Sequence, residues 1–121
     1  MPGQGPSTPR HVPKPWGSEE IWAETDAYIG KILTIRQGHR LSLQHHAIKD
    51  ETIRVVRGAL DLTLEDAGGV LRTQRLGPGD VVRIHPLRRH RMHAVTDVEI
   101  YEVSTSHVDD VVRHEDDYGR V

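Results

Sequence analysis

Residues 38–51 read GHRLSLQHHAIKDE, a stretch that starts on a glycine, alternates briefly between apolar and polar residues, and ends strongly polar. Side chains of a β-strand point alternately to opposite faces of the sheet. Gln44 and His46, two positions apart, therefore share one face, together with Ser42 and Arg40. The stretch predicts a short strand that gathers nitrogen and oxygen donor atoms on one side.

The rest of the chain continues this pattern of short strands from about Val12 onward, without a long helical period. The segment Leu60–Glu65 alternates apolar and polar residues and is the clearest half-buried strand. DAGG at 66–69 and GPGD at 77–80 predict tight turns, because glycine accepts the positive φ that such turns require. About eight to ten short strands at this spacing predict an all-β fold, a sandwich or a jelly-roll barrel of two antiparallel sheets.

Length and charge limit the organisation of the protein. The 121 residues suffice for one modest hydrophobic core, so we expect a single domain over residues 12–121. Residues 1–11 contain few apolar side chains and are expected to form a flexible tail. A net charge of −2 gives no overall field that would attract nucleic acid or a membrane. We therefore expect neither nucleic acid nor a membrane as a partner.

The absence of cysteine excludes disulfides and thiolate metal sites, so any metal must be held by imidazole, carboxylate, amide or water. No apolar run approaches the roughly 20 residues that cross a bilayer. The N-terminus lacks the apolar core of a secretory signal. The expected compartment is the cytoplasm.

Four side chains form a candidate metal centre: Gln44 and His46 on one strand, Glu51 on its hairpin partner, and His90 on a distant strand. Such a set can converge inside a barrel and leave positions open for water or substrate. Taken singly, each residue has an ordinary explanation as a surface or hydrogen-bonded side chain. The donor types suit one divalent ion, most readily Zn, although Mn, Fe, Co and Ni accept the same ligands.

The spacing of these residues carries a family resemblance. The series Gly38, Gln44, His46, Glu51 and Gly58 resembles the first cupin signature, with glutamine in place of its usual first histidine. The second signature is matched by GDVVRIHP at 79–86 followed by His90, but Leu87 stands where the family prefers glycine. The resemblance implies a cupin double-stranded β-helix with these four residues as metal ligands.

Three blocks of the sequence resemble one particular family of cupins. KPWGSEE at 14–20, the stretch at 38–51 and DDVVRHEDDYGR at 109–120 look like the type II mannose-6-phosphate isomerase cupin, which also forms the C-terminal domain of bifunctional mannose-1-phosphate guanylyltransferases. The resemblance implies a metal-dependent enzyme of carbohydrate metabolism that interconverts mannose 6-phosphate and fructose 6-phosphate, and hence a small-molecule substrate, a sugar phosphate. That reaction moves a proton between C1 and C2, and a phosphorylated sugar calls for cationic side chains.

Four further residues are candidates for these tasks. Glu102 alternates with apolar neighbours on the last long strand, which makes it a candidate general base, and Lys31 is a second catalytic candidate. Arg40 and Arg120 are candidate phosphate ligands. Each has a plain alternative, a charged residue at the end of a strand or in a solvated tail.

Other functions of the same scaffold stay open: another metal-dependent cupin enzyme (an oxygenase, decarboxylase or cyclase) or a non-catalytic sugar-binding cupin. Their cavities should differ, because a phosphosugar site needs several converging cations whereas an oxygenase needs an apolar pocket. We also expect a homodimer, since Leu41 and Leu43 lie opposite the ligand face and predict an apolar outer surface.

Overall fold

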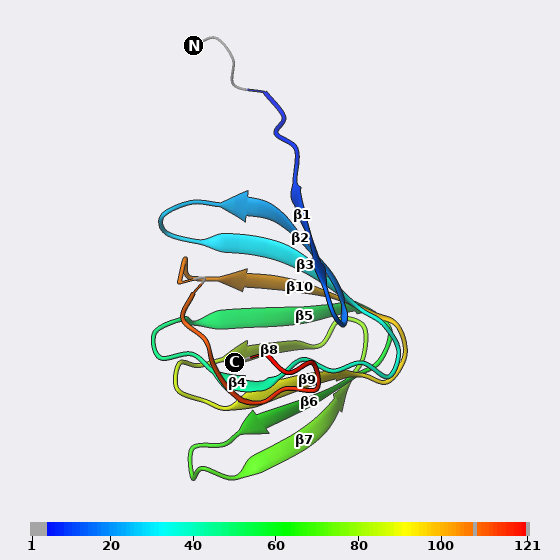
Figure 1. Ribbon diagram of the computed structural model, residues 1–121, viewed down its shortest axis with the longest axis vertical. Coiled ribbons are helices and arrows are strands. Elements are labelled where there is room, and N and C mark those ends of the chain that lie inside the picture. Colours follow the sequence, from blue (N-terminus) through cyan, green and yellow to red (C-terminus); the bar gives the residue numbers. More distant parts are fainter. Residues whose placement is uncertain (1–4, 108, 121) are drawn as a thin grey trace.

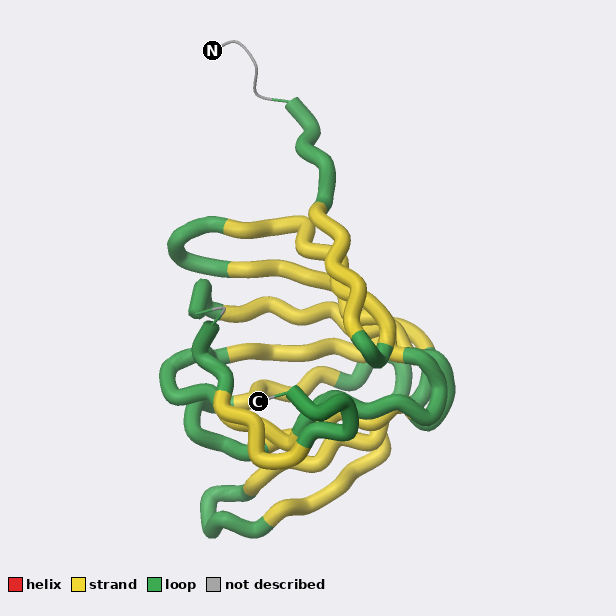
Figure 2. The backbone as a smooth tube through the Cα atoms, viewed as in Figure 1, coloured by secondary structure: helices red, strands yellow, loops and turns green. Residues whose placement is uncertain are grey.

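The computed structural model describes residues 5–107 and 109–120, and strands are the only regular elements in them (Figures 1 and 2). The eleven strands are β1 (Arg10–Lys14), β2 (Gly17–Glu24), β3 (Ile29–Ile35), β4 (Leu43–His45), β5 (Glu51–Arg57), β6 (Leu60–Glu65), β7 (Leu71–Leu76), β8 (Val81–Ile84), β9 (His90–Ala94), β10 (Val98–Ser104) and β11 (Val112–Glu115). The prediction of an all-β fold is confirmed.

The strands form two antiparallel sheets that face each other (Figure 1). The larger sheet has the order β1-β2-β3-β10-β5-β8, and the smaller has the order β11-β4-β9-β6-β7. Consecutive strands repeatedly change sheets, as from β3 to β4 and from β4 to β5, so that neighbours within a sheet come from distant parts of the chain. This topology brings β4, β5 and β9, the strands that carry the predicted ligands, around one interior.

The space between the sheets is filled at one end by an apolar core. Its side chains are at most 5% exposed and are Trp16, Leu33, Ile35, Ile53, Val55, Leu60, Leu62, Leu76, Ile84, Met92, Ala94, Val98 and Ile100. Most occupy alternate strand positions, as the period of two requires. The strand over Leu60–Glu65 appears as predicted, with Leu60 and Leu62 fully buried. Polar side chains occupy the rest of the interior.

Two glycine positions of the signatures have a structural reason. Gly58, between β5 and β6, has φ +89°, and a Cβ there would lie 2.1 Å from the carbonyl oxygen of Asp97. Leu87 has φ +68° and is the non-glycine residue with positive φ in the described part of the chain. A left-handed backbone is the conformation that glycine adopts without penalty, which accounts for a glycine preference at Leu87.

The first strand begins before the expected boundary between the tail and the domain. β1 begins at Arg10, and both Arg10 and His11 pair with β2, so the first strand reaches into the range expected to be a flexible tail. Residues 1–4 of that range lie outside the described residues. The domain boundary at residue 12 therefore stays a prediction, with the strand starting two positions earlier.

The apolar outer surface expected from Leu41 and Leu43 is not present, and this expectation was wrong. Leu41 packs against the core and lines the interior cavity, while Leu43 is only 9% exposed. Leu41 precedes β4, so the strict alternation of a strand does not reach it. The homodimer stays a prediction without this support. Within the described residues, no segment forms a helix with the length and apolarity needed to cross a membrane.

Candidate metal centre and substrate cavity

The predicted metal ligands lie on adjoining strands at one end of the barrel interior. Gln44 is the middle residue of β4, His46 follows that strand directly, and Glu51 opens β5. His90 opens β9 and stands opposite Gln44 in the antiparallel register. Each of these side chains therefore starts from a strand or its immediate end, where the backbone fixes its direction.

His46, Glu51 and His90 converge. One donor atom from each lies within 4.8 Å of the other two, and all three residues are buried. The Oε1 atom of Glu51 is 3.2 Å from His90 Nε2 and 3.6 Å from His46 Nε2. Two imidazoles and one carboxylate with this spacing match the donor set of a borderline divalent ion.

The hydrogen bonds of the two rings leave the inward nitrogens available. His90 Nδ1 lies 3.0 Å from the carbonyl oxygen of Arg88, and His46 Nδ1 contacts that of Asp110. A carbonyl only accepts, so each Nδ1 carries the proton and each Nε2 presents its lone pair inward. Among the described residues, His90 Nε2 and Glu51 Oε1 have no hydrogen-bond partner. Buried polar atoms without partners are unusual, and a bound cation would satisfy both, so the residues fit a metal.

The charge state of Glu51 agrees with this role. Burial by itself would raise the pKa of its carboxyl group, but the adjoining His46 and His90 rings and the charge of Lys49 outweigh burial and hold the pKa well below its usual range. The carboxylate is therefore ionised at neutral pH, as a metal ligand must be.

Gln44 lies beside this group without presenting its oxygen to it. Its Oε1 accepts a hydrogen bond from the Ser42 hydroxyl, and its Nε2 lies 3.4 Å from His46 Nε2. A half-turn of the amide would exchange the two atoms and direct the oxygen toward the histidines. Gln44 as a metal ligand stays a prediction.

An inner cavity of about 60 Å³ is lined by two of the three converging residues, Glu51 and His90, and by Glu102 among others, whereas His46 lines the larger cavity described below. Glu102 projects into it from β10, as its strand parity predicted. Its Oε2 forms ion pairs with Lys49 Nζ at 3.2 Å and with Lys31 Nζ at 3.7 Å. The inner cavity therefore combines Glu51 and His90 with the carboxylates of Glu102 and Glu19 and with two ammonium groups. The three converging residues His46, Glu51 and His90 are called the metal group from here on.

These neighbours shift the pKa values within the inner cavity. Burial and the charge of Glu51 raise the pKa of Glu102 to about 7, and Lys49 and Lys31 offset part of that rise. For Lys49, burial favours the neutral form, but the carboxylates of Glu102 and Glu51 outweigh burial and raise the pKa. Lys49 is thus a permanent cation, whereas Glu102 has two accessible protonation states near neutral pH.

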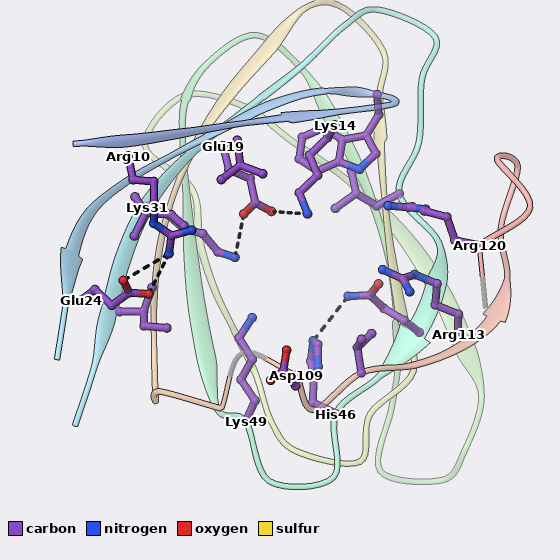
Figure 3. A pocket seen from close by; sticks show the side chains of 17 residues that line it. Arg10, Lys14, Glu19, Glu24, Lys31, His46, Lys49, Asp109, Arg113 and Arg120 are labelled. Atoms are coloured by element: carbon purple, nitrogen blue, oxygen red, sulfur yellow. Dashed lines mark hydrogen bonds and ion pairs between the residues drawn. The ribbon is translucent and has the colours of Figure 1, made fainter. Parts of the chain in front are cut away.

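A larger cavity of about 330 Å³, here called the mouth, shares Glu19, Lys31, Gln44 and Lys49 with the inner cavity and widens outward. Its charged lining is mainly basic and consists of Arg10, Lys14, Lys31, Lys49, Arg113 and Arg120, against the acidic Glu19, Glu24 and Asp109. Figure 3 shows the amino groups of Lys14, Lys31 and Lys49 directed into its open centre, with Arg113 and Arg120 across from Lys31 and Lys49. The mouth is suited to an anionic ligand.

The two predicted phosphate ligands are placed differently. Arg120 lines the mouth, with its guanidinium paired to Asp116 at 2.9 Å. The side chain of Arg40 is about half exposed and forms an ion pair with Asp117 at 2.6 Å. It lines neither cavity. Arg40 precedes β4 and forms only an isolated bridge, so its shared parity with Gln44 did not direct it inward.

Sequence reasoning missed several residues of the cavities, above all Lys49, Glu19 and Lys14. Lys49 and Glu19 lie within quoted blocks of the sequence, and a buried charged residue there is visible only once its partners are known. Glu19 links Lys31 at 3.3 Å to Lys14 at 4.0 Å. The resulting chain of opposite charges runs from the mouth to the inner cavity.

A two-sheeted β-barrel that directs histidine and carboxylate ligands into its interior defines the cupin class, and this protein is a cupin. Residues 5–116 match the family model described as mannose-6-phosphate isomerase C-terminal, and the chain belongs to that family. The family resemblance read from the sequence blocks is therefore confirmed.

Sequence similarity to curated proteins supports the same family. The chain is 31% identical over 109 residues to the alginate biosynthesis protein AlgA of Pseudomonas aeruginosa, a match that covers 90% of this chain and 23% of that protein. It is 32% identical over 117 residues to a mannose-1-phosphate guanylyltransferase of Escherichia coli, covering 93% of this chain and 23% of that one. The chain thus spans about a quarter of the length of these relatives.

Solved structures show the same fold at lower identity. KdgF from a Halomonas species superposes with a TM-score of 0.72 at 24% identity, covering 86% of this chain and 90% of that one. Oxalate decarboxylase from Bacillus subtilis reaches a TM-score of 0.76 at 14% identity, covering 88% of this chain and 30% of that one. These likenesses establish the cupin fold and nothing about the reaction.

Proposed function

We propose that this cupin is a metal-dependent aldose–ketose isomerase of a sugar phosphate, converting mannose 6-phosphate to fructose 6-phosphate. The observation that carries the proposal is the arrangement of the cavities. The buried residues His46, Glu51 and His90 line two adjoining cavities, and the charged lining of the larger one, the mouth, is mainly cationic. Family membership supports the same reaction class.

His46, Glu51 and His90 would hold the metal, with Gln44 as a fourth ligand after its amide turns. A bound divalent ion would supply Lewis acidity that stabilises negative charge developing on the O1 and O2 oxygens of the open-chain sugar. Zn is the proposed ion, and the donor set also accepts Mn, Fe, Co and Ni.

Glu102 is the proposed base. Its carboxylate would take the proton from C2 of the aldose, leaving an enediolate, and return that proton to C1, while a proton moves between the two oxygens. Lys49 and Lys31, the ion-pair partners of Glu102, would keep the inner cavity cationic as negative charge develops on the substrate. The two lysines therefore stabilise charge, and the carboxylate moves the proton.

The phosphate would bind in the mouth. Lys14, Arg113 and Arg120 line it, and a phosphate could replace Glu19 and Asp116 as the partners of Lys14 and Arg120. The mouth resembles neither the apolar pocket of an oxygenase nor the filled barrel of a binding module. Its charge supports the phosphosugar over those alternatives.

The test is turnover of two sugars by the metal-loaded protein. Mannose 6-phosphate should yield fructose 6-phosphate, and unphosphorylated mannose should react far more slowly because it lacks the group that the mouth binds. Full metal occupancy is checked on the same sample by elemental analysis. Turnover of neither sugar at full occupancy would reject the isomerase and favour another cupin chemistry.

A further inference from the structure

Asp110 lies between β10 and β11, yet its side chain contacts a loop some sixty residues earlier in the chain. The carboxylate accepts three backbone N–H bonds: Oδ1 from Ala47 at 3.1 Å, and Oδ2 from Ile48 at 2.7 Å and from Lys49 at 2.9 Å. Three successive amides directed at one carboxylate fix the path of residues 47–49, while the flanking His46 and Asp50 are bonded to Leu87 and Thr105.

That loop joins β4 to β5 and determines where three functional side chains stand. His46 opens it, Lys49 lies within it, and Glu51 follows it as the first residue of β5. A shift of this loop would displace two of the three converging metal ligands and the ammonium group beside Glu102. The geometry of the site therefore depends on what holds the loop.

The main chain of Asp110 acts on the same site. Its carbonyl oxygen accepts the Nδ1–H bond of His46, which selects the tautomer with a free Nε2 and orients the ring. One residue thus fixes both the backbone that carries His46 and the ring itself. The side-chain bonds can be removed by substitution, whereas the carbonyl is retained in every variant.

We propose that Asp110 is a positioning residue of the metal centre: its carboxylate holds the loop at 47–49 so that His46 and Glu51 stay arranged for a divalent ion. The inference rests on the proposed function only in needing the metal centre. It is distinct from anchoring of the C-terminal segment, residues 109–120, because that segment has other attachments to the barrel, including Arg91 to Glu115 and Arg40 to Asp117.

Three variants separate positioning from anchoring. Asp110→Ala removes all three acceptor bonds, whereas Asp110→Asn can place its amide oxygen at the Oδ2 position and keep the bonds from Ile48 and Lys49. Asp117→Ala is the matched control, since it releases the same segment from Arg40 without touching the loop. Circular dichroism of the metal-free proteins confirms that each is folded.

The first readout is Co²⁺ binding. It is measured by the visible absorption of Co²⁺ during its titration into metal-free protein. We expect Asp110→Ala to weaken Co²⁺ binding about tenfold to a hundredfold and to alter the absorption bands. Asp110→Asn should recover part of the affinity, and Asp117→Ala should match the wild type. Equal affinity in the wild type and Asp110→Ala, or an equal loss in Asp117→Ala, would overturn the inference.

The His46 ring gives a second readout that needs no metal, the ¹⁵N chemical shifts of its two nitrogens. The metal-free wild type and Asp117→Ala should show the Nδ1–H tautomer. Asp110→Ala keeps the carbonyl but releases the loop, so the His46 ring should move away from that carbonyl part of the time and show a mixture of tautomers. An Nε2–H tautomer in the wild type, or no change in Asp110→Ala, would contradict positioning by Asp110. Absence of Co²⁺ binding in the wild type with this tautomer pattern present would reject the proposed function and leave the positioning of His46 supported.

Discussion

The metal group and the mouth are held in different ways, although both line one continuous space. The side chains of His46, Glu51 and His90 are at most 6% exposed. The ring of each histidine is held by a hydrogen bond to a backbone carbonyl. The mouth is built from longer side chains, such as Lys14 with 29% of its side chain exposed and Arg120 with 25%. The first region is rigid enough to hold an ion, and the second can rearrange around a ligand.

The metal group and the mouth also differ in whether their charged atoms already have partners. The ionised Glu51 sits between two imidazoles without a hydrogen-bond partner for Oε1 among the described residues. Arg10 and Arg120 in the mouth already have carboxylate partners, Glu24 and Asp116. A ligand at the mouth must replace existing ion pairs, which lowers its net gain, whereas a metal ion satisfies atoms that have no other partner. Substitutions should therefore have larger effects at the metal group than at the mouth.

The largest effect is expected from the metal group itself. His46→Ala leaves two protein ligands of the converging set, so it should remove most bound metal and with it all turnover. Elemental analysis after reloading and dialysis measures the loss. His45→Ala is the matched control, because His45 is the adjacent residue and bonds to His114 on the exposed surface. A His46→Ala protein that retains stoichiometric metal would place the ion elsewhere.

A smaller effect is expected from the proposed base. Glu102→Gln keeps the size of the side chain and removes its ability to accept a proton, so kcat should fall about 10²- to 10⁴-fold. Metal content should stay at the wild-type level, which separates this variant from the ligand variants. Glu99→Gln on the same strand removes a carboxylate paired with the exposed Arg57 and should leave kcat unchanged. Unaltered kcat in Glu102→Gln would assign the proton transfer to another group.

At the mouth, Arg120 and Arg40 form a natural comparison, since sequence alone proposed both as phosphate ligands. Arg120→Ala should raise KM for mannose 6-phosphate about tenfold or more, the value of one charge-assisted hydrogen bond. Arg40→Ala should leave KM close to the wild-type value, because its guanidinium pairs with Asp117 outside the cavities. Steady-state kinetics of the two variants decides between them, and an equal rise in KM for both would contradict the placement of Arg40.

The smallest expected effect concerns the backbone near the site. Leu87 is 66% exposed and has φ +68°, so glycine there removes a left-handed penalty of about 1–2 kcal/mol while adding about 0.5–1 kcal/mol of chain entropy. Leu87→Gly should thus raise the free energy of unfolding by up to about 1.5 kcal/mol, as measured by urea denaturation. A loss of stability would mean that contacts of the leucine side chain outweigh its strained backbone.

Residues on or directly beside regular strands could be predicted from the sequence better than residues outside them. The convergence of His46, Glu51 and His90 could be expected from the short spacings of the first signature and from the second signature. Glu102 was predicted by the same alternation on β10. The placement of these side chains could be predicted because regular backbone geometry carries the information, and their roles as ligands and base stay predictions.

Residues outside regular strands were predicted less well. Arg40 and Leu41 precede β4, where alternation no longer holds, and both point in directions opposite to those expected. Lys49 was missed because a buried ammonium group is stable only beside Glu51 and Glu102, and that juxtaposition depends on the pairing of β5 with β10. Tertiary partners, rather than local pattern, decide these positions.

The most direct test of the account is a crystal structure of the metal-loaded protein soaked with mannose 6-phosphate, with the metal located by its anomalous scattering. The account predicts a single strong peak within coordination reach of His46 Nε2, His90 Nε2 and the Glu51 carboxylate. It also predicts the phosphate among the basic side chains of the mouth, with Glu102 facing C1 and C2. A metal bound elsewhere, or a phosphate outside the mouth, would contradict it.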